Sequence, residues 1–360
     1  MNNWLIIYLI AFLLSGLTSY FITFLTRIIS TRLKIIDNPS SLKMHKEPIP
    51  RLGGIGIFIG FTISTILLLS KQSIVVRFGL SIPMIDHTVL SIIIGSSIVM
   101  LVGLYDDIKA STSNGITAIA KLIILFGVTI LLAQGGILLN FPLPYTINFI
   151  LTLFWIVGVI SAFNAIDNMN GLAAGLAIIA SGTYAIIALQ TGQWLWGILA
   201  VILMGSNTGF LPHNFRFKKQ AAIFMGDSGS FFIGFTLATL SIMGGWSTSP
   251  IKSAVIPVII LGVPILDLIY VVIRRYQQKI TTNIPQIITY TGHDHLSHRI
   301  SHFLSHRQTV LFVYLISFTL GIGAIALRNT TKWEAILILI QYCLIFSIII
   351  LLIEFIHKSK

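Results

Sequence analysis

The sequence predicts an all-α, polytopic integral membrane protein, and its composition is the first reason. Only 9% of the 360 residues are charged, 55% are hydrophobic, and the mean hydropathy is +0.93. Ordinary soluble proteins carry roughly 25% charged residues, so this chain has too little polar surface to cover a globule in water. A soluble enzyme is therefore excluded, and lipid is expected to be the main solvent.

Long apolar runs are the second reason, because they recur along the whole chain. A helix needs about 20 residues to cross the hydrocarbon layer, and lipid forces the backbone to satisfy its own hydrogen bonds. We expect eleven such helices, with ten or twelve also compatible with the short loops. They are predicted at 4–26, 53–70, 89–105, 116–133, 146–166, 172–189, 193–211, 230–245, 254–273, 310–328 and 334–356. No soluble segment interrupts them, so residues 1–360 are interpreted as one integral membrane domain.

The basic residues predict the orientation. Alternate loops carry 17 Lys and Arg residues on one side of the predicted bundle and five on the other. The positive-inside rule then places the N-terminus outside the cell and the C-terminus in the cytoplasm. The protein is therefore expected in the cell membrane. The net charge of +12 lies in loops between apolar runs rather than in a stripe with exposed aromatics, so no nucleic-acid partner is expected.

The acidic residues are few, and most of them fall on the predicted cytoplasmic side. Four lie at helix ends beside very short loops, namely Asp106, Asp107, Asp167 and Asp227. A secondary transporter, the main alternative from another class, places its ionisable groups near the bilayer midplane. Acids gathered at one membrane face favour an enzyme with its active site on the cytoplasmic face.

Two motifs place carboxylates where a divalent cation would bind. Asp106 and Asp107 are adjacent in GLYDDIK and repel each other unless a cation or a shared proton holds them, which indicates Mg²⁺. The alternative is a pair of solvated helix-end charges. In FMGDSGS, Asp227 precedes a new helix, whose N-terminus can hold a phosphate while the carboxylate holds its metal ion. A simple helix N-cap is the alternative there.

Three further stretches suit a polar ligand. In NAIDNMNGL, Asn164, Asp167 and Asn170 recur every three residues and share a helical face. Amides and a carboxylate on one face can bind a nucleobase or a metal ion. The alternative is that these residues only cap the helix end. The loop TGHDHLSHRISHFLSHR favours a phosphate pocket over zinc, since cysteine ligands and a HExxH motif are missing. The loop DNPSSLKMHKEPIPRLGG can fold over a pyrophosphate or serve only to set the orientation.

In this order the motifs resemble the polyprenyl-phosphate N-acetylhexosamine-1-phosphate transferase family, most closely its bacterial undecaprenyl-phosphate GlcNAc-1-phosphate transferase branch. The resemblance runs from about residue 37 to residue 310. It implies transfer of a HexNAc 1-phosphate from a UDP-N-acetylhexosamine to undecaprenyl phosphate, with Mg²⁺ or Mn²⁺ as cofactor and UMP as product. The sister phospho-MurNAc-pentapeptide translocases, the alternative within the family, carry a run of adjacent histidines that this chain lacks. The choice of sugar and the oligomeric state, a homodimer included, are left open.

The resemblance also implies roles for individual residues. Asp106 matches the family's proposed base, Asp107 would place the nucleophile or the metal, and Asp227 matches the principal Mg²⁺ ligand. Asp167 is grouped with the catalytic carboxylates. The implied substrate-binding residues are Lys46, Lys121, Asn164, Asn170, Asn214, Phe224, His295, His298 and Arg299.

Phe224, Asn170 and Lys121 have features beyond the shared motif pattern. Phe224 corresponds to an aromatic that stacks on uracil, and Asn170 stands where the family usually has an acid. Lys121 lies inside a predicted span, where a cation is a functional-site hypothesis by default and snorkelling to the interface is the alternative. Asp267 also lies in a predicted span, two turns before Arg274, and we interpret that pair as stabilising a helix end.

Overall fold

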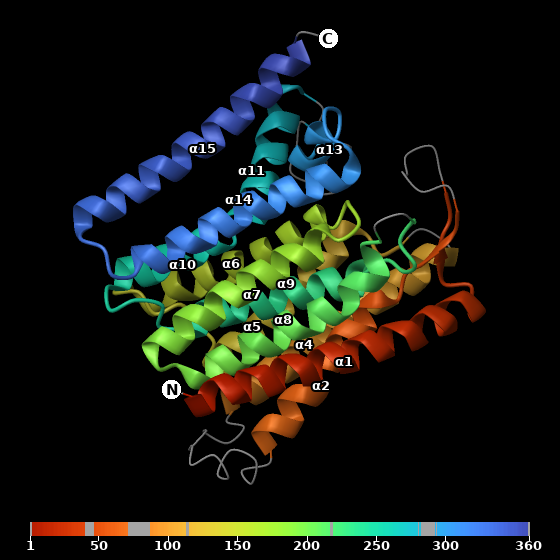
Figure 1. Ribbon diagram of the computed structural model, residues 1–360, viewed down its shortest axis with the longest axis horizontal. Helices are drawn as coiled ribbons and strands as arrows, with labels where there is room; N and C mark the ends of the chain where they lie inside the picture. The colour runs from red at the N-terminus through yellow and green to blue at the C-terminus, as the bar shows by residue number, and fades with distance from the viewer. Residues whose placement is uncertain are drawn as a thin grey trace.

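The computed structural model describes residues 2–39, 47–70, 87–112, 115–216, 219–279, 281, 292 and 294–358. These residues form a bundle of long helices that run side by side (Figure 1). The helices are α1 Asn2–Arg32, α2 Gly53–Ser70, α4 His87–Thr112, α5 Ala118–Gln134, α6 Tyr145–Ile166, α7 Leu172–Thr191, α8 Trp194–Asn214, α9 Gly226–Met243, α10 Pro250–Ile260, α11 Gly262–Gln277, α13 Leu296–Ile300, α14 His306–Leu327 and α15 Lys332–Lys358. Strands β1 Ile36–Asp37 and β2 Ile49–Pro50 form one short antiparallel pair.

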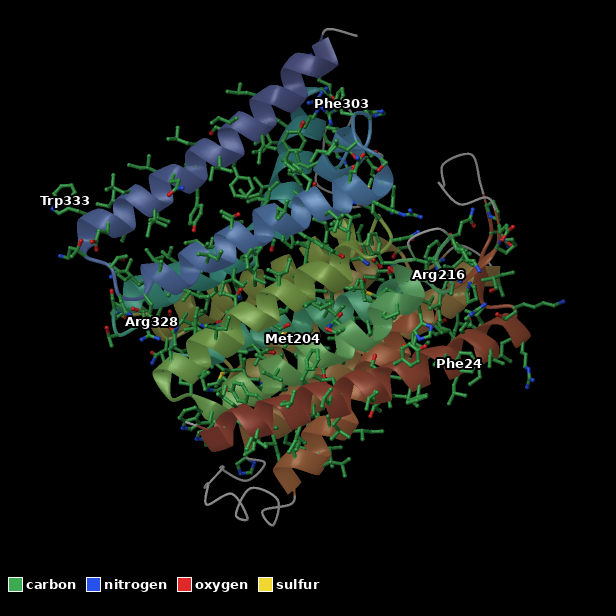
Figure 2. All side chains as sticks on the ribbon, viewed as in Figure 1. Phe24, Met204, Arg216, Phe303, Arg328 and Trp333 are labelled. Carbon is green, nitrogen blue, oxygen red and sulfur yellow. The ribbon has the colours of Figure 1, made fainter. Side chains whose placement is uncertain are left out.

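The predicted fold class is confirmed: the protein is a polytopic helical membrane protein. Seven described helices are long and apolar enough to cross a membrane, or eight if the bent pair α10 and α11 counts as one span, while α2 and α5 are shorter apolar helices. Side chains on the outside of the bundle are apolar, as lipid requires. Phe24 and Trp333 project outward from α1 and α15, whereas Arg216 and Arg328 lie at opposite ends of the bundle (Figure 2). The number of spans and the orientation of the termini stay predictions.

One expected span is broken. Residues 254–273, predicted as a single helix, form the end of α10 and most of α11, which meet at an angle of 72°. Pro264 follows the break at Leu261 and has no N–H to donate to the carbonyl of Ile260, so the helix cannot continue straight. The break directs α11 toward the end of the bundle where the acidic residues gather.

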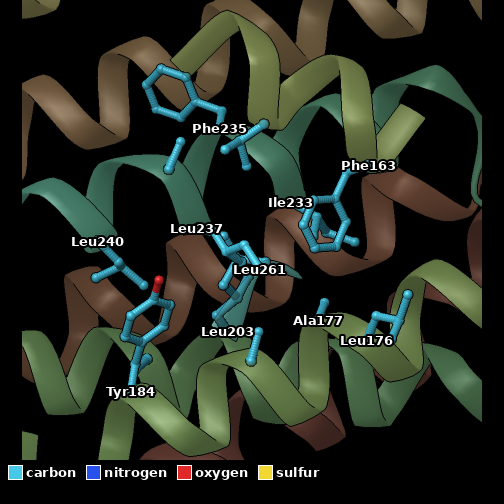
Figure 3. Packing of buried hydrophobic residues seen from close by; sticks show 14 of the residues in the cluster. Phe163, Leu176, Ala177, Tyr184, Leu203, Ile233, Phe235, Leu237, Leu240 and Leu261 are labelled. Carbon is cyan, nitrogen blue, oxygen red and sulfur yellow. The ribbon is translucent and has the colours of Figure 1, made fainter. Parts of the chain in front are cut away.

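Helix α9 is the centre of the bundle. Every residue from Ser228 to Ser241 is buried, because α2, α4 and α6 pack around it. The hydroxyl groups of Thr236, Thr239 and Ser241 bond to carbonyl groups within the helix, as Thr236 Oγ1 does to the carbonyl of Phe232 at 2.8 Å. A helix shielded from lipid tolerates this polarity, and α9 is less apolar than α2 and α6, which pack against it. Figure 3 shows Ile233, Leu237 and Leu240 of α9 within this core.

The β1–β2 pair joins the first loop to the N-terminus of α9. The chain after β2 pairs with the chain before α9: Phe224 N donates to the carbonyl of Pro50 at 2.7 Å, and Gly53 N donates to the carbonyl of Phe224 at 3.0 Å. Gly54 N continues the ladder to the carbonyl of Met225 at 2.8 Å. Segments more than 170 residues apart are thereby fixed beside the first turn of α9.

The close contact between α4 and α9 yields a stability prediction. A Cβ added at Gly103 would collide with the backbone of Asp227 and Ser228. Gly103→Ala should therefore lower the stability by about 1–3 kcal/mol, the usual cost of overpacking, and lower the melting temperature in detergent. Gly127→Ala in α5 is the matched control, since a Cβ there meets nothing within 4 Å. Equal melting temperatures for the two variants would contradict this packing.

Candidate active site

Lys121 is the centre of the candidate site. Its Nζ lies 2.7 Å from Oδ2 of Asp106 and 2.5 Å from Oδ2 of Asp227, so one ammonium bridges a carboxylate of α4 and a carboxylate of α9. Asp106 accepts a further hydrogen bond through Oδ1 from Ile116 N at 2.5 Å. The lysine therefore extends from the first turn of α5 toward two acids rather than toward the lipid interface.

Asp107 lies next to this pair but faces the backbone of α9. Its Oδ1 accepts a hydrogen bond from Asp227 N at 3.0 Å, and its Oδ2 accepts one from Ser228 N at 3.1 Å. Amides in the first turn of a helix have no partner within the helix, and the positive end of the helix dipole favours an anion there. The buried Asp107 carboxylate thus caps α9 and positions Asp227.

Gly226 is the residue that allows this cap. Its φ of +76° is in the left-handed region, and a Cβ there would collide with Oδ2 of Asp107. Only glycine avoids both the strain and the clash. The small-residue turn of FMGDSGS is therefore explained by the approach of Asp107.

Asn164 and Asp167 approach the same acids from the end of α6. Nδ2 of Asn164 donates to Oδ1 of Asp227 and to Oγ of Ser230, both at 3.1 Å. Asp167 is the C-cap residue of α6. Burial raises the pKa of Asp167 well above its ordinary value, and the charges of Asp227 and Asp107 raise it further. Arg51 opposes this shift.

The other implied residues of the site differ in placement. Asn214 is buried, and both ends of its amide bond to backbone: Oδ1 accepts from Gly171 N at 2.5 Å, and Nδ2 donates to the carbonyl of Ile223 at 2.9 Å. It therefore joins the NAIDNMNG loop to the segment before α9. Phe224 is half-buried in that segment, and Asn170 is half-buried in the loop. Lys46 lies outside the described residues.

The histidine loop, the stretch TGHDHLSHRISHFLSHR of the sequence, is anchored to α11 through two acids. His295 Nδ1 lies 2.6 Å from Oδ2 of Asp267, whose Oδ1 accepts a hydrogen bond from Leu296 N at 2.8 Å. The sequence predicted that Asp267 pairs with Arg274, and this prediction was wrong. The chain returns to α11 and brings His295 to the carboxylate of Asp267 instead. Arg274 Nη1 instead donates to Tyr270 Oη at 2.9 Å.

A second anchor lies beside the first. The guanidinium of Arg275 binds Asp294 at two points, with Nε to Oδ2 at 2.5 Å and Nη2 to Oδ1 at 2.8 Å. Although burial favours the protonated acid, the hydrogen bonds and charge of Arg275 hold the pKa of Asp294 below its ordinary value. His298 is buried in α13, and Arg299 lies with its Cζ 5.7 Å from the Tyr270 ring centroid.

The histidine loop also touches the NAIDNMNG loop. Ser297 Oγ donates to Oδ1 of Asn168 at 2.8 Å. Neither residue was singled out by the sequence as part of a site, and a single hydroxyl or amide gives no signal of its own. The contact brings α13 to the side of the acid cluster.

Arg51 is a further member of the site. Its Nη1 lies 3.3 Å from Oδ1 of Asp37, and its Nε lies 3.8 Å from Oδ1 of Asp107. The sequence placed Arg51 in a basic loop but gave no reason to separate it from the other cations there. Because Arg51 directly follows β2, its guanidinium lies beside the buried carboxylate of Asp107.

The donors at the site fit a magnesium ion that binds together with substrate. Among the described residues, no group of three or more His, Cys, Asp or Glu side chains is arranged to hold a metal ion. Mg²⁺ is usually held by one or two carboxylates together with water and substrate phosphates. Asp227 is half-buried beside Asp107, and its two oxygens accept from Lys121 and Asn164, so it would offer a carboxylate to an ion that displaces one of these donors. Asp107, whose two oxygens cap α9, is suited to hold Asp227 in place.

The fold and the site together define a class: an integral membrane protein with acids, amides and cations from at least five segments converging at one end of a helical bundle. A family model described as glycosyl transferase family 4 matches residues 89–245. The chain belongs to this family, the polyprenyl-phosphate N-acetylhexosamine-1-phosphate transferases that its motifs resemble.

Relatives with similar sequences agree with this membership. A Bacillus subtilis protein named probable undecaprenyl-phosphate N-acetylglucosaminyl 1-phosphate transferase is 35% identical, over 94% of this chain and 90% of that protein. The decaprenyl-phosphate N-acetylglucosaminephosphotransferase of Mycobacterium leprae is 30% identical, over 87% of this chain and 81% of that protein. The undecaprenyl-phosphate alpha-N-acetylglucosaminyl 1-phosphate transferase of Salmonella typhi is 27% identical, over 86% and 81%.

The environment of Asp167 predicts a pH-dependent stability. Because its pKa is raised on folding, its contribution to stability is fully present below the unfolded value of about 3.9 and is lost as pH rises through the folded value. Asp167→Asn, which stays neutral, should therefore gain melting temperature relative to wild type as pH rises above the unfolded value of Asp167. The measurement is thermal unfolding in detergent without metal or nucleotide.

The opposite sign is expected at Asp294, which serves as the control. Its lowered pKa means that the ion pair with Arg275 is already intact throughout that pH range. Asp294→Asn should lower the melting temperature by a constant amount. Parallel pH curves for wild type and Asp167→Asn would contradict the environment assigned to Asp167.

The Asp267 anchor predicts a change in local protection. Asp267→Ala removes the acceptor of Leu296 N, so hydrogen exchange of the peptide covering residues 294–300 should become faster. Asp267→Asn keeps one acceptor oxygen and should lie between alanine and wild type. Unchanged exchange at the Leu296 amide in Asp267→Ala would show that another group holds the loop.

Proposed function

We propose that this protein transfers GlcNAc 1-phosphate from UDP-GlcNAc to undecaprenyl phosphate, with UMP as the second product. The printed names of the relatives support the substrates, since they name undecaprenyl or decaprenyl phosphate and GlcNAc phosphate. The observation that carries the proposal is the bridge from Lys121 to Asp106 and Asp227, with Asn164 on the second oxygen of Asp227. This transfer is the first membrane step in the synthesis of a cell-wall or surface glycan.

The reaction exchanges one phosphoric anhydride for another. A phosphate oxygen of the lipid attacks the phosphorus that carries the sugar, and the bond from that phosphorus to the oxygen bridging to UMP breaks. The lipid then carries a diphosphate linked to GlcNAc, and UMP departs with the bridging oxygen. Both reactants are anions, so the site must offset their repulsion and hold them in line.

The lysine provides a positive charge for this task. The ammonium of Lys121 is oriented by two carboxylates at the N-terminal end of α5, and an arriving phosphate can replace one of them as its partner. Asp106, released from that contact, accepts the proton of a protonated lipid phosphate. Arg51, on the other side of Asp107, adds a second cation to the site.

The nucleotide and the phosphates bind between the loops around these groups. Asn164, Asp167 and Asn170 offer hydrogen-bonding groups to the uracil, and Phe224 offers a face for stacking. Asn214 acts by holding the two loops together.

Cations and imidazoles complete the substrate site. His298 and Arg299 in α13, and His295 on the anchored loop, contact the diphosphate or the sugar. Lys46 of the first loop is assigned to the phosphates on the family resemblance alone.

Mg²⁺, or Mn²⁺ in its place, is the proposed cofactor, with Asp227 as its carboxylate ligand and Asp107 beside it. When bound, the ion neutralises charge on the diphosphate. The active site is proposed to face the cytoplasm, because the loops at this end carry most of the basic residues.

The activity predicts a specific dependence on reactants. Purified protein in detergent should release UMP from UDP-GlcNAc only when undecaprenyl phosphate and Mg²⁺ are both present. Asp227→Ala and Lys121→Met should each lower kcat about a hundredfold or more, as loss of one charge-stabilising group in an active site does. The measurement is UMP release together with formation of the lipid diphosphate.

Two controls make the test sharp. Arg328→Gln, at the opposite end of the bundle, should keep wild-type activity. A panel of UDP-GlcNAc, UDP-GalNAc and UDP-MurNAc-pentapeptide distinguishes GlcNAc transfer from the translocase reaction. Full activity of Asp227→Ala would remove the metal assignment, and turnover of the MurNAc donor alone would replace the proposed function.

A further inference from the structure

A basic pocket lies beside the candidate active site, at the same end of the bundle. It is an open cavity of about 500 Å³ between the C-terminal part of α1, strand β2 and the segment that follows α8. Arg27 and Thr31 of α1 line one side, and Arg216 and Lys219 line the other. Figure 2 labels Arg216 at this end of the bundle, where α8 ends near the first loop. None of Asp106, Lys121 and Asp227 lines the pocket.

The charges of the pocket favour an anion. Three cations line it, Arg27, Arg216 and Lys219, and Glu47 is the acid among its described lining residues. Arg27 belongs to α1 and Arg216 to the segment after α8, yet the charges of both act on the buried His213 at the end of α8. Like charges gathered in one cavity repel each other unless an anion joins them, and guanidinium groups fit phosphate oxygens with two parallel hydrogen bonds.

The pocket continues into a surface suited to lipid chains. Tyr20, Phe24, Arg27 and Thr31 follow one another at three- and four-residue spacing and therefore share one face of α1. Tyr20 and Phe24 are 42% and 47% exposed, so this face presents aromatic surface to the membrane just before it reaches the basic residues. An anion with an attached apolar chain could occupy both parts at once.

Strand β2 separates the pocket from the reaction centre. Pro50 lines the pocket, and its carbonyl accepts a hydrogen bond from Phe224 N at 2.7 Å. The next residue, Arg51, does not line the pocket, and its guanidinium pairs with Asp37 and Asp107. The pocket and the acid cluster therefore use different cations of the same region.

We propose that this pocket binds the phosphate headgroup of an anionic membrane phospholipid, with an acyl chain lying along Tyr20 and Phe24 of α1. The headgroup phosphate is held by Arg27, Arg216 and Lys219. The site is separate from the transfer reaction and does not depend on the proposed function. A lipid bound there joins α1 to the segment before α9 and stabilises the first loop.

The test uses delipidated full-length protein in neutral detergent. Phosphatidylglycerol should bind and raise the melting temperature, whereas phosphatidylcholine should not, with binding followed by native mass spectrometry. The double variant Arg216→Gln with Lys219→Gln should bind phosphatidylglycerol about tenfold more weakly or worse, since it loses two cations that contact the phosphate. Arg32→Gln is the matched control, because Arg32 is a basic residue of α1 that does not line the pocket.

The remaining outcomes decide against the proposal. Equal binding of both lipids, or no loss in the double variant, would overturn it. Binding of inorganic phosphate that phosphatidylglycerol fails to displace would assign the pocket to a soluble phosphate. A rise in KM for UDP-GlcNAc in the double variant, with lipid binding unchanged, would assign it to the reaction centre. Equal melting temperatures of lipid-free wild type and double variant establish that the variant folds.

Discussion

The bridge that Lys121 forms between Asp106 and Asp227 is the interaction on which the site depends. Two carboxylates from α4 and α9 would repel each other at this separation, and one ammonium between them reverses the sign of the interaction. The bridge requires α4 and α9 to approach closely. Gly103 allows that approach, because any side chain there would meet the backbone of Asp227.

The first turn of α9 is the meeting point of segments from the whole chain. Asp107 caps its amides, Gly226 makes room for that cap, and Asn164 holds the carboxylate of Asp227 from α6. The paired segments after β2 and before α9 fix the first loop to the same place. Since α9 is buried along its length, this turn is held on all sides, and a rigid support of this kind is what precise positioning of phosphates requires.

The histidine loop has a different kind of support. Two pairs tie it to α11: Asp267 with His295, and Arg275 with Asp294. The break before α11 directs that helix toward the site. A basic pocket beside β2 shares none of Asp106, Lys121 and Asp227 with the acid cluster. The end of the bundle therefore combines the candidate active site with a second, separate group of cations.

The sequence by itself determined that the chain lies in a membrane and where most of its helices run, and it predicted that acidic residues gather at one end of the bundle. Composition and apolar runs report the solvent and the local hydrogen bonding, and short motifs such as GLYDDIK and FMGDSGS mark helix ends. The family also followed from the order of these motifs. Tertiary structure alone decided the partners of Lys121, the cap formed by Asp107 and the pairing of Asp267 with His295. These contacts join residues up to 120 positions apart, and no local pattern encodes them, because they depend on how the helices pack and on which loops return to them.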